Sequence, residues 1–158
     1  MTQPVDVLSD PRAVCLTPPG GVGQYAFVRQ AGGLLFLAGI GPRRADTRAI
    51  PGVRVDGAGN VLDYDIEFQV RQCFANVNGV LRNHGSEWGR IIDVTVFMTD
   101  LPRDFDAFNT LWQEYFPHLA ERPCRTTVEV SRLPQAGDSP INFEVKVVAT
   151  LRHDSPPS

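Results

Sequence analysis

The stretch DIEFQVRQCFANVNGVL, residues 65–81, marks the point where the apolar pattern of this chain changes from short runs to a helical period. Apolar side chains recur here every three or four residues, at Ile66, Val70, Phe74, Val77 and Leu81. This spacing predicts an amphipathic helix. Asp63 or Asp65 can cap its start, and the Asn-His-Gly sequence at 83–85 can end it.

Strand-like segments precede this helix. Residues 25–29 and 34–40 are two apolar runs, and residues 30–33 between them form a plausible hairpin turn. Residues 41–62 are rich in Gly, Pro and Arg and predict one long loop. Loops of this length inside compact domains are often functional.

The elements after the helix alternate in type. Residues 91–99 alternate as a strand, and a second helix is expected to begin near Asp104. That helix places five large side chains along one side: Phe105, Phe108, Leu111, Trp112 and Tyr115. Two strands, 126–133 and 141–151, complete the pattern.

The element order β-β-loop-α-β-α-β-β predicts an α+β fold, a single domain in which two helices cover one face of a mixed sheet. Several strands carry apolar residues on both sides, as in residues 34–37 and 145–148. Sheets with that pattern are covered on both faces. An oligomer is the simplest cover for the second face.

Length and composition agree with one globular domain. The 158 residues are 42% hydrophobic and 21% charged, which is ordinary for a globular protein. We assign them to one domain, 1–158, with its core at about 17–151 and frayed ends. No apolar run approaches the roughly 18 residues that span a bilayer. Residues 1–10 lack the pattern of a secretory signal, so we expect no membrane association and a cytoplasmic location.

Charge and cysteine usage argue against a nucleic-acid-binding protein and against a disulfide-bonded one. The net charge is −3 and the basic residues are scattered, whereas nucleic-acid binding needs a concentrated positive field. Cys15, Cys73 and Cys124 are an odd, widely spaced set, which indicates reduced thiols.

The motifs of several enzyme classes are missing. A zinc deaminase needs His-x-Glu and Pro-Cys-x-x-Cys, but Pro123-Cys124 is followed by Thr127 and no His-x-Glu occurs. The chain has no Gly-x-Gly-x-x-Gly, phosphate loop or Gly-x-Ser-x-Gly motif. We therefore expect neither a catalytic metal nor a cofactor.

Two charged residues on the last strands are the remaining candidates. Arg125 opens the strand after Pro123-Cys124, and Glu144 lies within the apolar run 141–148. A carboxylate there is costly to bury unless it is paired. Spacing alone favours a Glu144 that points outward from a half-exposed strand and an Arg125 that is an ordinary surface or ion-paired residue.

These segments resemble the RidA/YjgF (Rid) family of imine deaminases. The likeness rests on Pro-x-Arg with two small residues and Val at 123–128, Leu-Pro at 133–134 and the Glu-bearing final strand. Further matches follow in order at Gly23-Gln24-Tyr25, 37–40, 69–77, 93–101 and 105–109, so that residues 17–151 are covered.

The resemblance implies a homotrimer with clefts between subunits. It implies that Arg125 binds a substrate carboxylate, a role that suits the two-pronged guanidinium group. It also implies that Glu144 positions the hydrolytic water, a role that suits a general base or acid. Further substrate-binding positions implied are Tyr25, Gly39, Asn109, Trp112 and Thr127. The alternative for Trp112 is a role in the core, and the alternative for Asn109 is a local hydrogen bond. Many members carry Cys where this chain has Thr127, and Cys124 here is expected to be a packed small residue.

The long loop with Arg43 and Arg44 is similar to the 2-aminomuconate deaminase branch of the family. A diacid substrate would use this pair for its distal carboxylate, whereas the ordinary alternative is a solvated loop. The function expected is release of ammonia from a small unsaturated amino acid such as 2-aminomuconate. A generalist 2-aminoacrylate deaminase and a non-catalytic carboxylate-binding trimer remain alternatives; the acidic balance does not support a nuclease.

Overall fold

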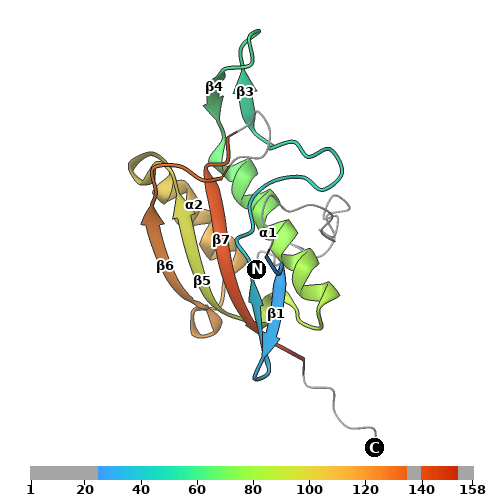
Figure 1. Cartoon of the computed structure of the whole chain (residues 1–158). Coiled ribbons are helices and arrows are strands. Elements are labelled where there is room, and N and C mark those ends of the chain that lie inside the picture. Colours follow the sequence, from blue (N-terminus) through green and yellow to red (C-terminus); the bar gives the residue numbers. More distant parts are fainter. Residues whose placement is uncertain (1–24, 135–139, 153–158) are drawn as a thin grey trace, which may run out of the picture.

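The structure, a computed structural model, describes residues 25–134 and 140–152. A five-stranded sheet forms one layer and two helices form the other (Figure 1). The elements of the sheet are β1 (Val28–Ala31), β2 (Leu34–Leu37), β5 (Ile91–Met98), β6 (Cys124–Glu129) and β7 (Phe143–Thr150). The helices are α1 (Ile66–Asn83) and α2 (Leu101–Tyr115), and a separate hairpin consists of β3 (Val53–Val55) and β4 (Val61–Tyr64).

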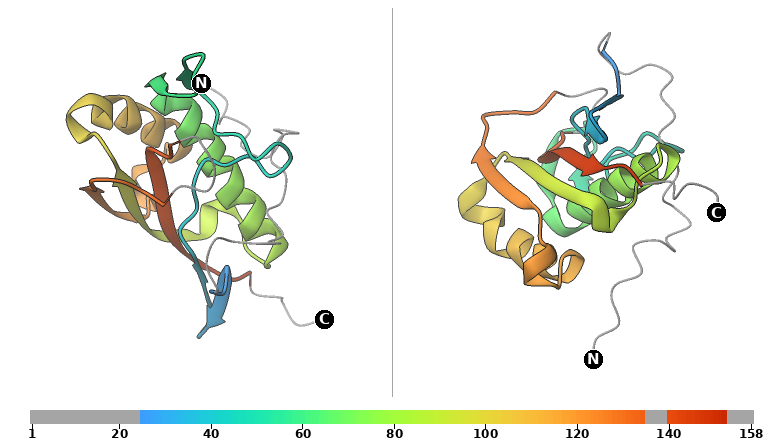
Figure 2. Two further views of the ribbon diagram at one scale, coloured as in Figure 1. Left: turned by 45° about the horizontal axis from the view of Figure 1, so that its top comes forward. Right: turned by 90° about the horizontal axis from the view of Figure 1, so that it is seen from below.

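The sheet is mixed, as predicted. Its strand order is β1-β2-β7-β5-β6, and only the β5–β6 pair is parallel. Seen from below, both helices lie on the same side of these strands (Figure 2). The prediction of an α+β domain with two helices on one face is confirmed.

Helix α1 begins where the sequence pattern placed it. The side chain of Asp65, not Asp63, accepts a hydrogen bond from the backbone N–H of Glu67 at 2.9 Å. This cap satisfies one of the N–H groups that a helix start leaves free. At the other end Gly85 takes a φ of 77°, the left-handed conformation that ends many helices.

Helix α2 begins three residues earlier than expected. Its cap is Asp100, whose side chain accepts from the N–H of Arg103 at 3.0 Å, and Pro102 lies in the first turn. Proline is favourable there because no intrahelical N–H bond is lost. Asp104 is instead inside the helix and buried, with 2% of its surface exposed.

The prediction of one unstructured loop over residues 41–62 was wrong, because its second half forms the β3–β4 hairpin. The Asp56 side chain accepts from the backbone N–H of Ala58 at 2.9 Å and of Asn60 at 2.8 Å, and so closes the turn. Asp and Asn stabilise turns in this way. The hairpin projects from one end of the sheet (Figure 1).

The remaining strands differ from expectation mainly at their ends. Strand β1 covers 28–31 rather than 25–29, so the turn is reduced to Gly32 and Gly33, whose φ angles are 57° and 77°. Two consecutive positive φ angles favour glycine and match the twist of a tight hairpin. Strand β6 starts at Cys124 and ends at Glu129, four residues before the predicted end.

The core lies between the sheet and the helices. It includes fully buried Phe74 and Val77 of α1, Phe108 of α2, and Phe143 and Val145 of β7. The opposite sheet face is not covered in this way and exposes Phe36 and Val128. Within the described residues no helix is both long and apolar enough to cross a membrane. Cys15 and Gly23-Gln24 lie outside the described residues.

Candidate active site

Arg125 lies on β6 with its side chain turned toward α2. Strand pairing sets Arg125 beside Val94, which is buried under the helices, so both side chains leave the same face of the sheet. The guanidinium carbon lies 5.9, 5.2 and 4.9 Å from the ring centres of Phe105, Phe108 and Trp112. Cation–π contacts of this kind hold a guanidinium in place without neutralising its charge.

A hollow of about 490 Å³ opens beside this guanidinium. It is lined by Leu101, Pro102 and Phe105 of α2 and by Arg125 and Thr127 of β6. The Thr127 hydroxyl is buried and has no hydrogen-bond partner. A buried hydroxyl without a partner is costly, and Thr127 itself lines this hollow.

The charge of Arg125 is uncompensated within the described chain. No described carboxylate pairs with it, and the neighbouring charge is the cationic Arg122. Burial and then Arg122 lower the pKa of the Arg125 guanidinium, which nonetheless stays protonated at neutral pH. An unpaired, partly desolvated guanidinium fork beside a hollow is suited to a carboxylate or phosphate group.

Glu144 lies on β7 but on the opposite face of the sheet. It pairs with Phe97, whereas its neighbour Val145 pairs with the buried Val96. Gly39 lies directly against the Glu144 carboxylate, so these two predicted site residues are brought together. Burial raises the pKa of Glu144. Because Arg125 faces the helices, the two side chains leave opposite faces of the sheet.

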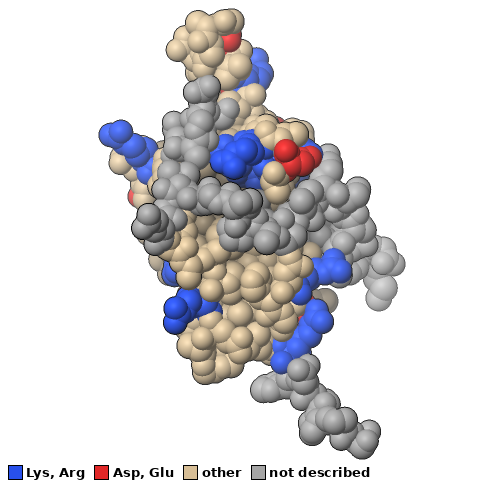
Figure 3. Space-filling view, turned by 45° about the vertical axis from the view of Figure 1, so that its right-hand side comes forward, with Lys and Arg blue, Asp and Glu red and all other residues tan. Residues whose placement is uncertain are grey.

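Arg43 and Arg44 lie near the other edge of the sheet, where the loop after β2 runs along α1. The Asn76 side chain of α1 donates to the carbonyls of Gly41 and Arg43, both at 2.9 Å. Arg43 donates to the carbonyl of Arg48 at 2.7 Å while its Nη2 is buried without a partner. Arg44 pairs with Asp46 at 3.2 Å. On the face in Figure 3, basic side chains form separate groups rather than one field.

The other predicted positions are distributed differently. Trp112 is a core residue with 6% of its surface exposed; its ring contacts Arg125 but does not line the Arg125 hollow. Tyr25 is 63% exposed at the start of the described chain. Asn109 is half-buried on α2 and does not line the Arg125 hollow. Cys124 is an exposed free thiol rather than a packed residue, and Cys73 is buried.

Sequence reasoning did not assign Leu101 and Pro102 to the site, and it treated Phe105 as part of an apolar helix face. In the structure Phe105 stays 36% exposed while Phe108 and Leu111 on the same helix are buried, a difference that the apolar period of the sequence does not mark. Side chains of His, Cys, Asp and Glu in the described ranges form no group of three that could hold a metal.

The fold and this site define a class: a small α+β protein with an arginine beside a hollow on the edge strand of a mixed sheet. The family model described as endoribonuclease L-PSP matches residues 16–151. The chain belongs to this family, the Rid family.

Relatives cover nearly the whole fold. A RutC family protein of Synechocystis is 35% identical over 133 residues, 84% of this chain and 90% of the relative. TdcF of Escherichia coli K12 is 31% identical over 132 residues, 83% of this chain and 89% of the relative. The crystal structure of E. coli YjgF matches with a TM-score of 0.67 at 30% identity, covering 85% of this chain and 93% of that one. E. coli TdcF with bound serine matches with a TM-score of 0.67 at 31% identity, with the same coverage.

Proposed function

We propose that this chain is an enamine/imine deaminase that acts on small amino-acid-derived intermediates bearing one carboxylate, such as 2-aminoacrylate. The observation that carries the proposal is the unpaired Arg125 guanidinium beside a hollow with the unpartnered Thr127 hydroxyl. A relative from Arabidopsis thaliana, 27% identical over 133 residues, is named reactive intermediate deaminase A. The TdcF structure, with serine bound, shows that a relative of this fold takes a small amino acid.

The reaction needs few groups from the protein. The enamine tautomerises to an imine, water adds to the imine carbon, and the carbon–nitrogen bond breaks to release ammonia and a 2-oxo acid. Arg125 would hold the carboxylate through a charge-assisted bond worth about 1.5–3 kcal/mol. Glu144 would take a proton from the attacking water and return it to the leaving nitrogen. Orientation then accounts for most of the remaining acceleration.

In a homotrimer, Glu144 of one copy would meet Arg125 of the next; the opposite sheet faces that these two side chains leave fit a site shared between copies. The open sheet face supplies the apolar surface for such contacts, since Phe36 and Val128 are each 37% exposed and Ile92 is 42% exposed. Association of copies would bury this surface, and the burial of apolar surface is the main driving force of oligomer formation.

The test is the release of ammonia and pyruvate from freshly generated 2-aminoacrylate. Arg125→Ala should reduce kcat/KM by about a hundredfold, since the charge-assisted bond to the carboxylate is lost. Arg82→Ala is the matched control, because it removes an exposed arginine at the end of α1. Wild-type turnover equal to the uncatalysed rate, with small carboxylates still bound, would favour a non-catalytic carboxylate-binding protein instead.

A second candidate is a deaminase for the diacid 2-aminomuconate. The observation that favours it is the buried Nη2 of Arg43, which lacks a partner and could meet a distal carboxylate. Removing Arg43 and Arg44 together should then raise KM for the diacid far more than KM for 2-aminoacrylate. Equal effects on both substrates would exclude this role for the loop.

A further inference from the structure

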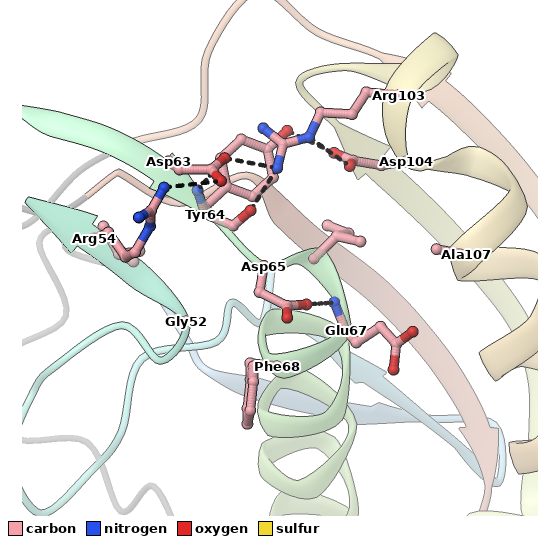
Figure 4. Close-up of a pocket in the computed structure, with 12 residues that line it drawn as sticks. Gly52, Arg54, Asp63, Tyr64, Asp65, Glu67, Phe68, Arg103, Asp104 and Ala107 are labelled. Carbon is pink, nitrogen blue, oxygen red and sulfur yellow. Dashed lines mark hydrogen bonds and ion pairs between the residues drawn. The ribbon is translucent and has the colours of Figure 1, made fainter.

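A second hollow, of about 640 Å³, lies where the β3–β4 hairpin meets the two helices, and the proposed reaction does not use it. Hairpin residues form one wall, the first turn of α1 another, and Arg103, Asp104 and Ala107 of α2 a third (Figure 4). Its most unusual feature is a carboxylate taken out of water, that of Asp104.

Asp104 is bound from two sides. The Tyr64 hydroxyl of β4 donates to Asp104 Oδ2 at 2.5 Å, and Arg103 Nε lies 3.4 Å from Oδ1. A buried carboxylate is retained at low cost only when such partners satisfy it. We call these three residues, Tyr64, Arg103 and Asp104, the Asp104 clamp.

Arg103 extends the clamp along the hairpin. Its Nη2 donates to Asp63 Oδ1 at 2.9 Å and to the carbonyl of Tyr64 at 2.5 Å. Its guanidinium carbon lies 3.9 Å from the centre of the Tyr64 ring. The start of α2 is therefore attached to β4 by hydrogen bonds, an ion pair and a stacked ring (Figure 4).

The same two turns of α2 form a wall of the Arg125 hollow on their other flank. Leu101, Pro102 and Phe105 line that hollow, whereas Arg103, Asp104 and Ala107 line the hollow at the clamp. At 100° per residue these two sets point to opposite sides of the helix. Any rotation or shift of the start of α2 toward or away from the hairpin must therefore change the Arg125 hollow.

We propose that the Asp104 clamp positions the wall of the Arg125 site, so that Tyr64 and Asp104 set the affinity for the carboxylate ligand although neither touches it. The inference rests on the proposed function in taking that ligand to be a small carboxylate. Two further hydrogen bonds at this helix start hold its backbone: Asp100 caps Arg103, and Glu129 Oε2 accepts from the N–H of Leu101 at 2.8 Å. The clamp is the side-chain anchor that faces the hairpin.

The experiment uses the full chain with methyl-labelled leucine and threonine, and pyruvate as the probe. Tyr64→Phe removes one hydroxyl and keeps the ring under Arg103. We expect the Leu101 and Thr127 methyl signals of the free protein to move, and pyruvate affinity to fall by about fivefold or more, because small displacements at such sites are costly. In turnover of 2-aminoacrylate, KM should rise and kcat should change little, because Glu144 lies on the other sheet face.

A second pair of variants separates shape from charge. Asp104→Asn keeps an oxygen that accepts from Tyr64 and should retain most of the pyruvate affinity, whereas Asp104→Ala should lose it. The control is Glu114→Gln, which removes the 3.2 Å ion pair with Arg71 that joins α1 to the far end of α2. This control should leave both methyl signals and pyruvate affinity unchanged.

A Tyr64→Phe protein with a lower Tm but unmoved Leu101 and Thr127 signals and unchanged affinity would overturn the proposal, since the clamp would then be only structural. If wild-type protein does not bind pyruvate, the proposed function fails instead. The methyl signals of the free Tyr64→Phe protein still decide whether the clamp positions the wall.

Discussion

Gly39 and Glu144 are in direct contact across the open face of the sheet, and the Glu144 carboxylate occupies the space that a side chain at position 39 would need. A Cβ on residue 39 would lie 3.0 Å from Glu144 Cδ and still closer to Oε1. The absence of a side chain at Gly39 therefore determines where this carboxylate can lie.

Gly39→Ala should displace the Glu144 carboxylate more than it destabilises the fold, because the atom that must move is the end of a side chain. We expect kcat to fall by about tenfold or more, as is typical when a general acid or base is moved. Gly41→Ala is the control, since its Cβ would meet Ile141 at an ordinary 3.6 Å. In a Glu144→Gln background, Gly39→Ala should have no further effect on kcat; an undiminished effect would refute the contact as its cause.

Thr127→Val should have opposite effects on stability and on binding. Valine keeps the shape and removes a buried hydroxyl that lacks a partner, so unfolding should become less favourable by about 1 kcal/mol. Binding of small carboxylates should weaken by about fivefold, the loss of one modest hydrogen bond. Thr127→Ser keeps the hydroxyl and should retain most of the affinity. A Thr127→Val protein that binds as well as wild type would show that the hydroxyl does not meet the ligand.

The two helices were predictable because each carries a long apolar period that only a helix satisfies. The β3–β4 hairpin was not, since its strands have three and four residues and expose Val55 and Leu62. Its stability comes from local turn bonds of Asp56 and from Arg103, a residue 40 positions beyond Asp63. Contacts between segments so distant in the chain leave no periodic signal in the sequence.

The site was only partly predictable for a related reason. Resemblance to a family singled out Arg125 and Glu144, but their opposite orientations depend on strand register, which is set by pairing with β5. A shift of one residue in register reverses which face a side chain leaves. Leu101 and Pro102 were missed because α2 starts at a cap, Asp100, that the apolar period alone does not locate.

Asn76 should be more important for stability than Asn109, although both are asparagines inside helices. The buried Asn76 side chain donates to two loop carbonyls, of Gly41 and Arg43. Asn76→Ala leaves both without this donor and should cost about 2–3 kcal/mol in the free energy of unfolding. Asn109→Ala should cost less than about 1 kcal/mol, since alanine is also the better helix former. Denaturant unfolding measures both, and equal losses would contradict the anchoring of this loop by α1.

Glu144 should make the folded protein less stable as the pH rises. Burial raises the pKa of this carboxyl above its value in the unfolded chain, so the folded state holds the proton more tightly. The sign follows from linkage. The contribution of the protonated Glu144 to the free energy of unfolding is complete below the pKa of the unfolded chain, about 4.3 for glutamate. This contribution is lost as the pH rises through the pKa of Glu144 in the folded protein. Glu144→Gln is neutral at every pH. The Tm of Glu144→Gln minus that of wild type should therefore increase between acidic and neutral pH. A difference that stays constant would mean that Glu144 is as well solvated in the folded protein as in the unfolded chain.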